Sequence, residues 1–254
     1  MKKLSFIMAV AMLLCVSTMQ AKNENISFQV QAGLNLSQMT GPMTVGDGPE
    51  EEENIKNPVK AGFNLSFRVD YQFNDYLAVQ TGLGYSMKGE TQKMDYENEE
   101  NDKETMKTSI HYLEIPILVG ARYSINDDIQ LQFNTGPYIA IGLGGKMKYK
   151  YTTDRIEYDH YVNGQAVGYN PSEEESWKIF GDDYEDGDMD SKRFDMGWKF
   201  ELGVDIKNYY VGLAYDLGFV DITNSKAKEA AKKYDDDYEP MKNRNFSINV
   251  GYRF

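Results

Sequence analysis

Residues 59–73 read VKAGFNLSFRVDYQF, and apolar and polar side chains alternate through the whole stretch. One set of alternate positions is apolar: Val59, Ala61, Phe63, Leu65, Phe67, Val69, Tyr71 and Phe73. The intervening set is polar or small: Lys60, Gly62, Asn64, Ser66, Arg68, Asp70 and Gln72. A two-residue period predicts a β-strand, with one face toward an apolar environment and the other toward one that tolerates charge.

The same alternation recurs along the chain. It occupies residues 28–37, 59–73, 77–87, 112–123, 129–143, 194–206, 209–219 and 246–254. Eight strands is an even number, which allows an antiparallel barrel to close. Pro116 and Pro137 fall inside two of these strands, and because proline has no backbone N–H we expect a bulge or a lost ladder hydrogen bond there.

The connections between these strands alternate in length. The short ones are Asn74–Asp75, Ser124–Asp128 and Lys207–Asn208. The long ones span residues 37–58, 88–107, 147–192 and 221–243. A barrel of this kind in the bacterial outer membrane has short turns at the periplasmic rim, long extracellular loops and both termini inside. A soluble barrel has no reason to segregate its loops in this way.

Alternation alone does not say which face is inside, since a lipocalin-like barrel turns its apolar face inward around a ligand. Glycines decide the direction, because they occupy the polar face and an eight-stranded interior is too narrow for large side chains throughout. They are Gly62, Gly82, Gly84, Gly120, Gly136, Gly142, Gly197, Gly203, Gly212, Gly218 and Gly251. The sequence therefore predicts an all-β protein, an eight-stranded antiparallel transmembrane up-and-down β-barrel with long extracellular loops, monomeric and facing lipid with its apolar side.

The N-terminus predicts export. Lys2 and Lys3 precede an apolar run and a polar stretch that ends at Ala21, which is typical of a secretory signal peptide over residues 1–21. The barrel domain would then be residues 22–254. Cys15, the single cysteine, would leave with the signal, and Leu14 stands where a lipidation site needs a small residue. The mature chain would then have no disulfide and no cysteine-ligated metal.

The formal net charge is −13, or −15 once Lys2 and Lys3 are removed, and this acidity argues against nucleic acid as a partner. Several ionisable residues fall on the polar strand face: Lys60, Arg68, Asp70, Glu114, Arg122, Lys199, Glu201, Asp205, Asp216 and Arg253. Ions removed from bulk water need partners, so we expect an interior ion-pair network. The alternative is a narrow path for protons or ions.

One acidic stretch invites comparison with a calcium-binding EF-hand loop. With Asp182 as the first position of an EF-hand loop, Tyr184 stands third and Arg193 stands twelfth, where the loop needs Glu. The motif fails, and solvated loops that interact loosely with divalent ions explain the same residues. In the last long loop, residues 225–234 have the composition of a short external helix.

Catalytic residues are not predicted. Ser109 and His111 lie on one face at the outer end of a strand, as in barrel enzymes that modify lipid, but no acidic residue stands beside them. His160 is alone in an acidic loop. The sequence has no P-loop, dinucleotide fingerprint or metal-spaced histidine pair. We therefore expect a non-enzymatic protein with no cofactor and no metal site.

The segment Tyr112-Leu113-Glu114-Ile115-Pro116 resembles the Tyr-Leu-x-Ile-Pro hallmark of the PorT-like outer membrane β-barrel family, and the ending Asn249–Phe254 is similar to that of the family. The resemblance implies an eight-stranded barrel inserted by the outer-membrane assembly machinery, which uses an aromatic C-terminus as its signal. It also implies one candidate role, because a branch of the family serves type IX protein secretion.

Four functions remain after the sequence analysis. The leading hypothesis is a surface scaffold whose acidic loops serve envelope integrity, adhesion or a partner protein. The first alternative is a secretion component of the PorT type. A lipid-modifying enzyme and a narrow pore are minor alternatives.

Overall fold

The computed structural model describes residues 25–41, 53–96, 102–162, 165–169, 171–180, 191–223, 228–229 and 239–254. The expected signal peptide (1–21), the acidic run 182–190 and most of the expected helix 225–234 lie outside the described residues, although Lys228 and Glu229 are helical. The described strands are β1 (Ile26–Thr40), β2 (Glu53–Lys56), β3 (Lys60–Gln72), β4 (Leu77–Tyr96), β5 (Lys103–Asn126), β6 (Ile129–Thr152), β7 (Glu157–Val162), β8 (Gln165–Tyr169), β9 (Ser172–Lys178), β10 (Phe194–Ile206), β11 (Tyr209–Gly218) and β12 (Lys242–Arg253).

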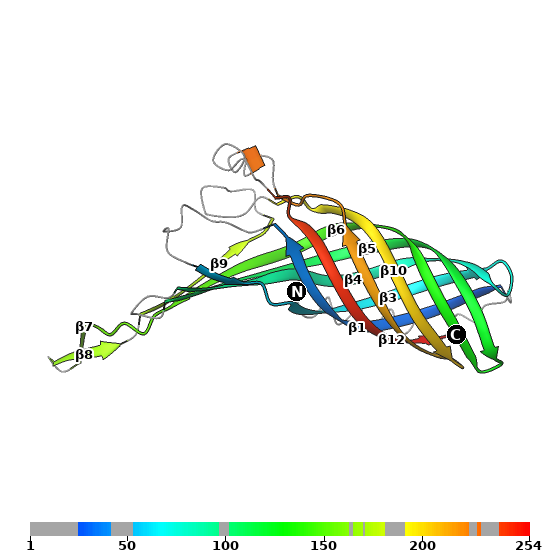
Figure 1. The fold of residues 1–254 in the computed structure, drawn as a ribbon, viewed down its shortest axis with the longest axis horizontal. Coiled ribbons are helices and arrows are strands. Elements are labelled where there is room, and N and C mark those ends of the chain that lie inside the picture. Colours follow the sequence, from blue (N-terminus) through cyan, green and yellow to red (C-terminus); the bar gives the residue numbers. More distant parts are fainter. Residues whose placement is uncertain are drawn as a thin grey trace.

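Eight of these strands close into an antiparallel ring, in the order β1-β3-β4-β5-β6-β10-β11-β12. The ring closes where β12 returns beside β1, and Figure 1 shows this as the red strand next to the blue one. At the seam, Phe28 and Phe254 exchange backbone hydrogen bonds of 3.1 and 2.9 Å. The predicted eight-stranded barrel is confirmed.

The faces of the strands point as the glycines indicated. On β1, Leu34 is 66% exposed, whereas Gln31 on the other face is 3% exposed. The pattern holds around the ring, where exposed apolar residues include Phe63, Val119 and Leu213. The apolar face is therefore the outer surface of the barrel, and the polar face lines the lumen.

The three short connections form tight turns at one rim. The Asn74 side chain accepts hydrogen bonds from the backbone N–H groups of Tyr76 and Leu77, both at 2.9 Å. Asn126 does the same for Asp128 and Ile129. A side-chain carbonyl that caps the next residues fixes a turn locally, which explains why these short links were readable from the sequence.

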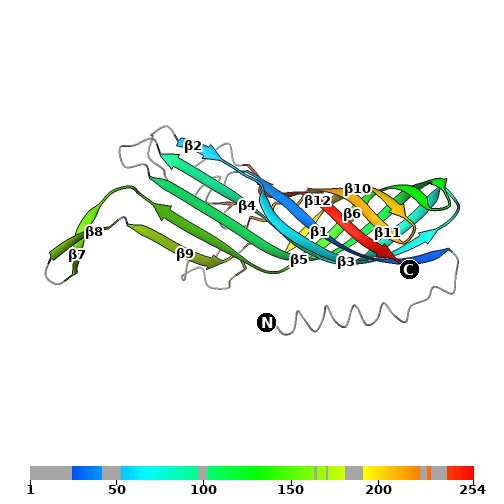
Figure 2. The same cartoon turned by 90° about the horizontal axis from the view of Figure 1, so that it is seen from below.

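The opposite rim differs from the prediction. Residues 88–107 and 147–192 were expected to be loops. Instead β4 continues to Tyr96, β5 already begins at Lys103, and β6 continues to Thr152. β2 pairs with β4 and β9 pairs with β6, so a sheet extends from one side of the barrel (Figure 2). We call the part formed by β2, β9, residues 88–96 of β4, 103–110 of β5 and 144–152 of β6 the projecting sheet. Above the lipid both faces of a strand can be polar, so the apolar alternation that marks a membrane strand is absent.

Of the two outcomes predicted for the prolines, a bulge or a lost ladder hydrogen bond, the structure shows the lost hydrogen bond. The ladder around Pro116 is interrupted on both sides, but the register before and after it is unchanged. The bulges lie elsewhere: Leu143 is an extra residue on β6 beside His111 and Tyr112, and Ile125 is an extra residue near the end of β5. A lost N–H donor thus removes ladder bonds without shifting the strands.

Candidate functional site

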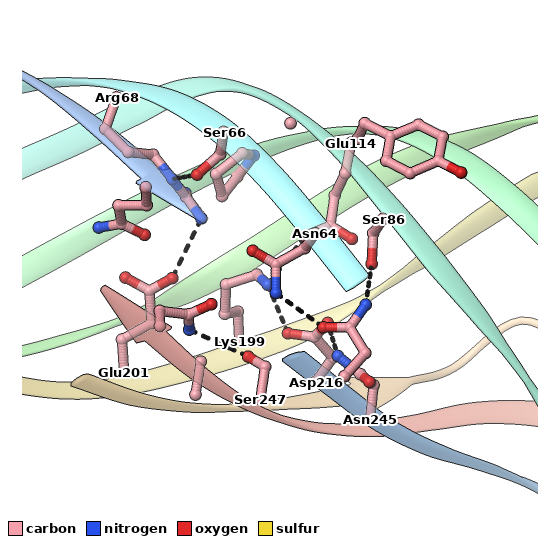
Figure 3. Close-up of a pocket in the computed structure, with 17 residues that line it drawn as sticks. Asn64, Ser66, Arg68, Ser86, Glu114, Lys199, Glu201, Asp216, Asn245 and Ser247 are labelled. Carbon is pink, nitrogen blue, oxygen red and sulfur yellow. Dashed lines mark hydrogen bonds and ion pairs between the residues drawn. The ribbon is translucent and has the colours of Figure 1, made fainter. Parts of the chain in front are cut away.

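Four buried charges form the centre of the lumen. The Lys88 Nζ atom lies 2.9 Å from Glu114 Oε2 and 2.9 Å from Asp216 Oδ2. The Lys199 Nζ atom lies 2.8 Å from Glu114 Oε1 and also contacts Asp216 Oδ1. Figure 3 shows Glu114, Lys199 and Asp216 converging from three different strands. Each ammonium bridges both carboxylates, so the four-charge cluster of Lys88, Lys199, Glu114 and Asp216 is formally neutral.

More ion pairs continue the network toward the turn rim. Arg68 is paired with Glu201 at 3.2 Å, and Arg122 is paired with Asp70. Arg253 is 2.8 Å from Asp205 and 3.9 Å from Asp70. The predicted interior ion-pair network is therefore confirmed for nine of the ten predicted residues, which are Arg68, Asp70, Glu114, Arg122, Lys199, Glu201, Asp205, Asp216 and Arg253. Lys88 was missed because it was assigned to a loop, although it continues the alternation one step beyond Met87.

Lys60 departs from the prediction. The ladder between β3 and β4 ends at Asn64 and Ser86, so Lys60 is not part of its register. The Lys60 side chain then lies beside Gly89, with its Cδ atom 3.0 Å from where a Cβ of Gly89 would stand. Burial and the neighbouring Lys107 lower the pKa of Lys60. Lys60 belongs to the outer rim rather than to the lumen network.

The lumen beside the four-charge cluster is nearly filled. A cavity of about 20 Å³ there is lined by side chains such as Asn35, Arg68 and Asn245 (Figure 3). That volume is about the minimum for one water molecule. Asn35 donates hydrogen bonds to Ser86 Oγ and to the Met87 carbonyl, both at 3.0 Å. Such a cavity has no room for an organic substrate or a hydrated ion.

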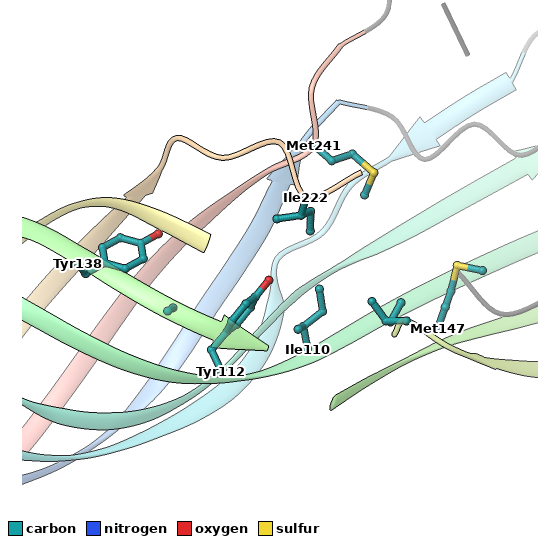
Figure 4. Packing of buried hydrophobic residues seen from close by; sticks show 8 residues of the cluster. Ile110, Tyr112, Tyr138, Met147, Ile222 and Met241 are labelled. Carbon is teal, nitrogen blue, oxygen red and sulfur yellow. The ribbon is translucent and has the colours of Figure 1, made fainter. Parts of the chain in front are cut away.

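An apolar cap closes the outer end of the lumen. Its side chains come from the barrel wall and from segments that follow β9 and β11 or precede β12, as Figure 4 shows for several of them. They are Ile110, Tyr112, Tyr138, Ala140, Met147, Ile179, Ile222 and Met241. Backbone hydrogen bonds hold these segments in place. The Ile179 N–H donates to the Gly145 carbonyl at 3.2 Å, and the Ile222 N–H donates to the Met241 carbonyl at 2.9 Å. The cap is thus a hydrogen-bonded part of the fold.

The two residues of the lipid-modifying alternative are brought to the same face but not into a catalytic arrangement. His111 shares a hydrogen bond through Nδ1 with the Tyr85 hydroxyl, and the two rings stack with centroids 5.9 Å apart. Ser109 is opposite Gly89 and Lys146 in the sheet. A neutral phenol on the histidine gives the imidazole no carboxylate to orient it as a base. The side chain of His160 lies outside the described residues.

The projecting sheet has two chemically different faces. The inward face continues the lumen side and carries Ile110, Met106, Met147 and Trp177. Glu90 is on this face, is 5% exposed, and burial raises its pKa to about 7. The outward face continues the lipid-facing side, and most of its charged residues are lysines. We call these the lysine face: Lys56, Lys93, Lys103, Lys107, Lys146, Lys148, Lys150 and Lys178.

The lysine face was not predicted from the sequence. Its signal is present in residues 146–150, KMKYK, where lysines alternate with Met147 and Tyr149. Within the part of the chain that the structure describes, no group of three or more His, Cys, Asp or Glu side chains could hold a metal ion. In the same residues, no helix is long and apolar enough to cross a membrane.

Comparison with known proteins places this fold in a family. Residues 19–224 match the outer membrane protein beta-barrel domain family, so the chain belongs to that family and is a β-barrel protein of the bacterial outer membrane. No curated protein matches the chain.

Solved structures that match include the attachment invasion locus protein Ail of Yersinia pestis, with 16% identity, a TM-score of 0.34, and 90% of this chain and 98% of that one covered. Neisserial surface protein A has 10% identity and a TM-score of 0.37, with 89% and 97% covered. OprG from Pseudomonas aeruginosa has 12% identity and a TM-score of 0.38, with 90% and 95% covered. Similarity at this level is no guide to function, and the description of the fold stands on the strand pairing itself.

Proposed function

We propose that the protein is a non-enzymatic surface scaffold, in which a sealed barrel anchors the projecting sheet and its adjoining loops outside the cell for contact with envelope components or a partner protein. The single observation that carries this proposal is the closure of the lumen. The four-charge cluster blocks its middle and the apolar cap covers its outer end. A closed barrel with a large external sheet supports a binding role better than transport.

The closure is stable for a physical reason. Charges buried in a narrow lumen are costly unless they are paired, and here each ammonium contacts two carboxylates. An open path through the centre would require Lys88 and Lys199 to leave both partners together. This argues against the narrow-pore alternative.

Two experiments test the scaffold. In planar bilayers the folded protein is expected to give no stable single-channel current at neutral pH, and a steady conductance would contradict the proposal. On intact cells, cross-linking should capture envelope components with the wild type but not with a variant in which residues 147–178 are replaced by a short Gly-Ser linker. Equal capture by that variant, checked for surface exposure and heat-modifiable migration, would contradict a role for the sheet.

A second candidate function is a PorT-type component of type IX protein secretion, which rests on the Tyr-Leu-x-Ile-Pro resemblance. Two residues of that motif point into the lumen: Tyr112 accepts a hydrogen bond from Asn243 at 3.1 Å, and Glu114 belongs to the four-charge cluster. These contacts give the motif a role in the stability of the barrel, which does not require secretion. Deletion of the gene that leaves secreted cargo unchanged would remove this candidate.

A further inference from the structure

The lysines of the projecting sheet are directly opposite one another across neighbouring strands. Lys107 on β5 pairs with Lys148 on β6. Lys146 on β6 pairs with Lys178 on β9, and Lys56 on β2 pairs with Lys93 on β4. Directly opposed residues of an antiparallel ladder share a face, with Cβ atoms about 5 Å apart. The outward face therefore contains three like-charge pairs on adjacent strands.

Such pairs oppose the pairing of the strands, because like charges directly across a ladder are destabilising. Two acidic side chains of this face contact lysines in the described part of the chain: Asp95 contacts Lys56 at 3.0 Å, and Glu174 contacts Lys148 at 3.5 Å. In the ladders these carboxylates are opposite Lys103 and Lys150, so eight lysines share the face with two carboxylates. Overall composition does not explain the excess of lysine, since the whole chain has a net charge of −13. Unfavourable charge that is concentrated on one face of one element points to an anionic ligand.

The position of this face limits what the ligand can be. It is continuous with the lipid-facing surface, because Met87 and His111 form the pair immediately below Gly89 and Ser109. A strand rises about 3.3 Å per residue, so lysines begin about 7 Å along the strand beyond the Met87–His111 pair, at Lys146 opposite Ser109, and continue to about 26 Å at Lys103. Because the strands are tilted, the height above the apolar band is smaller. The lysines nearest the barrel, Lys146 and Lys107 with the lysines opposite them, therefore stand at the height expected for the headgroups of the surrounding lipid.

We propose that the lysine face binds the phosphate groups of an anionic glycolipid in the outer leaflet that surrounds the barrel. Several exposed ammonium groups on a rigid sheet match a headgroup that carries more than one phosphate. Phosphate would neutralise the opposed pairs, and each basic residue near an anionic membrane surface strengthens its attachment.

A lipid fits this face better than a soluble polyanion. Lipid headgroups are held at the height of the lysines by the membrane that the barrel spans, which raises their local concentration. A soluble polyanion must approach a protein with a net charge of −13, which disfavours encounter. The inference depends on membrane insertion and is independent of the proposed scaffold role.

The test uses the full folded chain in detergent micelles doped with bisphosphorylated lipid A, with completely dephosphorylated lipid A as the reference lipid. Binding is measured as the rise, with lipid concentration, of the temperature at which the folded band is lost in the heat-modifiable migration assay. The variant is Lys107→Gln with Lys146→Gln and Lys148→Gln. Its matched control is Lys207→Gln, an exposed lysine in the turn at the opposite rim.

We expect the wild type and Lys207→Gln to prefer the bisphosphorylated lipid equally. The triple variant should lose about fivefold in affinity for each lysine removed, or roughly a hundredfold in total. Without lipid it should unfold no earlier than the wild type, because two like-charge pairs are gone, and this verifies the fold. The wild-type preference should also weaken with salt.

Three results would overturn the inference. One is equal affinity of the wild type for the two lipids. Another is unchanged lipid binding by the triple variant. The third is binding of dextran sulfate, in lipid-free detergent, as tightly as bisphosphorylated lipid A, since the face would then be a site for soluble polyanions.

Discussion

Removal of Lys88 tests whether the four-charge cluster acts as a balanced unit. The Lys88 ammonium contacts Glu114 and Asp216 at 2.9 Å each, and its side chain is 0% exposed. At an effective dielectric constant of about 20, each contact is worth about 6 kcal/mol of attraction. Repulsion from Lys199 and the cost of removing Lys88 from water offset most of this. Because Lys88→Met leaves one buried negative charge without compensation, we expect a loss of about 3–5 kcal/mol in the free energy of unfolding.

The assay is equilibrium unfolding in urea of barrels folded into lipid vesicles, followed by tryptophan fluorescence and by heat-modifiable migration. The control is Lys88→Met combined with Glu114→Gln, which removes one charge of each sign and restores neutrality. The double variant should recover at least half of the loss, since interacting buried charges are not additive. If the single variant were within about 0.5 kcal/mol of the wild type, or the double variant were no more stable than Lys88→Met alone, the cluster would not be a coupled unit.

Three further predictions follow from the faces of the strands. Leu213→Arg places a cation on the lipid-facing side, where 43% of the leucine is exposed. It should make the free energy of folding into bilayers less favourable by about 2–4 kcal/mol. Gly203→Ala would put a Cβ 2.2 Å from the Tyr210 ring, whereas a Cβ on Gly144 would have nothing within 4 Å. Gly203→Ala should therefore lower the unfolding temperature and reduce the free energy of unfolding by about 1–3 kcal/mol, and Gly144→Ala should do neither. Burial raises the pKa of Glu90 from 4.5 to about 7, so the folded state holds this proton more tightly than the unfolded chain. The contribution of Glu90 to stability is therefore fully present below pH 4.5 and falls by about 3 kcal/mol as the pH rises to 7. Glu90→Gln should abolish that fall.

Each of these predictions has an outcome that contradicts it. Normal insertion of Leu213→Arg would mean that this side of β11 does not face lipid. Equal melting of the two glycine variants would mean that the lumen around Tyr210 has spare room. A pH dependence that is the same in wild type and Glu90→Gln would assign the effect to other groups.

The barrel was predictable because the membrane enforces a two-residue period on each strand that crosses it. In residues 59–73 every outward position is apolar, so the face and the short turn at Asn74 could be read locally, as could the short link that contains Asn126. The sequence predicted that the lumen contains ion pairs, but not which residues are paired. Arg68 and Glu201 are 133 residues apart and meet only because β3 and β10 line one narrow lumen.

The external structure was not predictable by the same rule, for a physical reason. Above the lipid no face has to be apolar, so residues 103–110 and 144–152 continue as strands with lysines where the membrane segments have apolar residues. The apolar cap was also out of reach, because Ile179, Ile222 and Met241 lie in connections without a strand period and come together only through the closed ring.

Charge is the point at which the sequence was most misleading. A net charge of −13 suggests an acidic exterior, but the sum conceals where each sign lies. Lys146, Lys148 and Lys150 keep the same outward direction as the apolar residues further down the sheet, because Gly144 pairs with outward-facing His111 above the bulge at Leu143. The outer surface of the sheet therefore changes from apolar to basic along the strand direction, in the order in which a bilayer changes from hydrocarbon to phosphate. The strand pairing thus predicts a specific consequence of the alternation: the face that meets lipid tails within the membrane meets lipid headgroups above it.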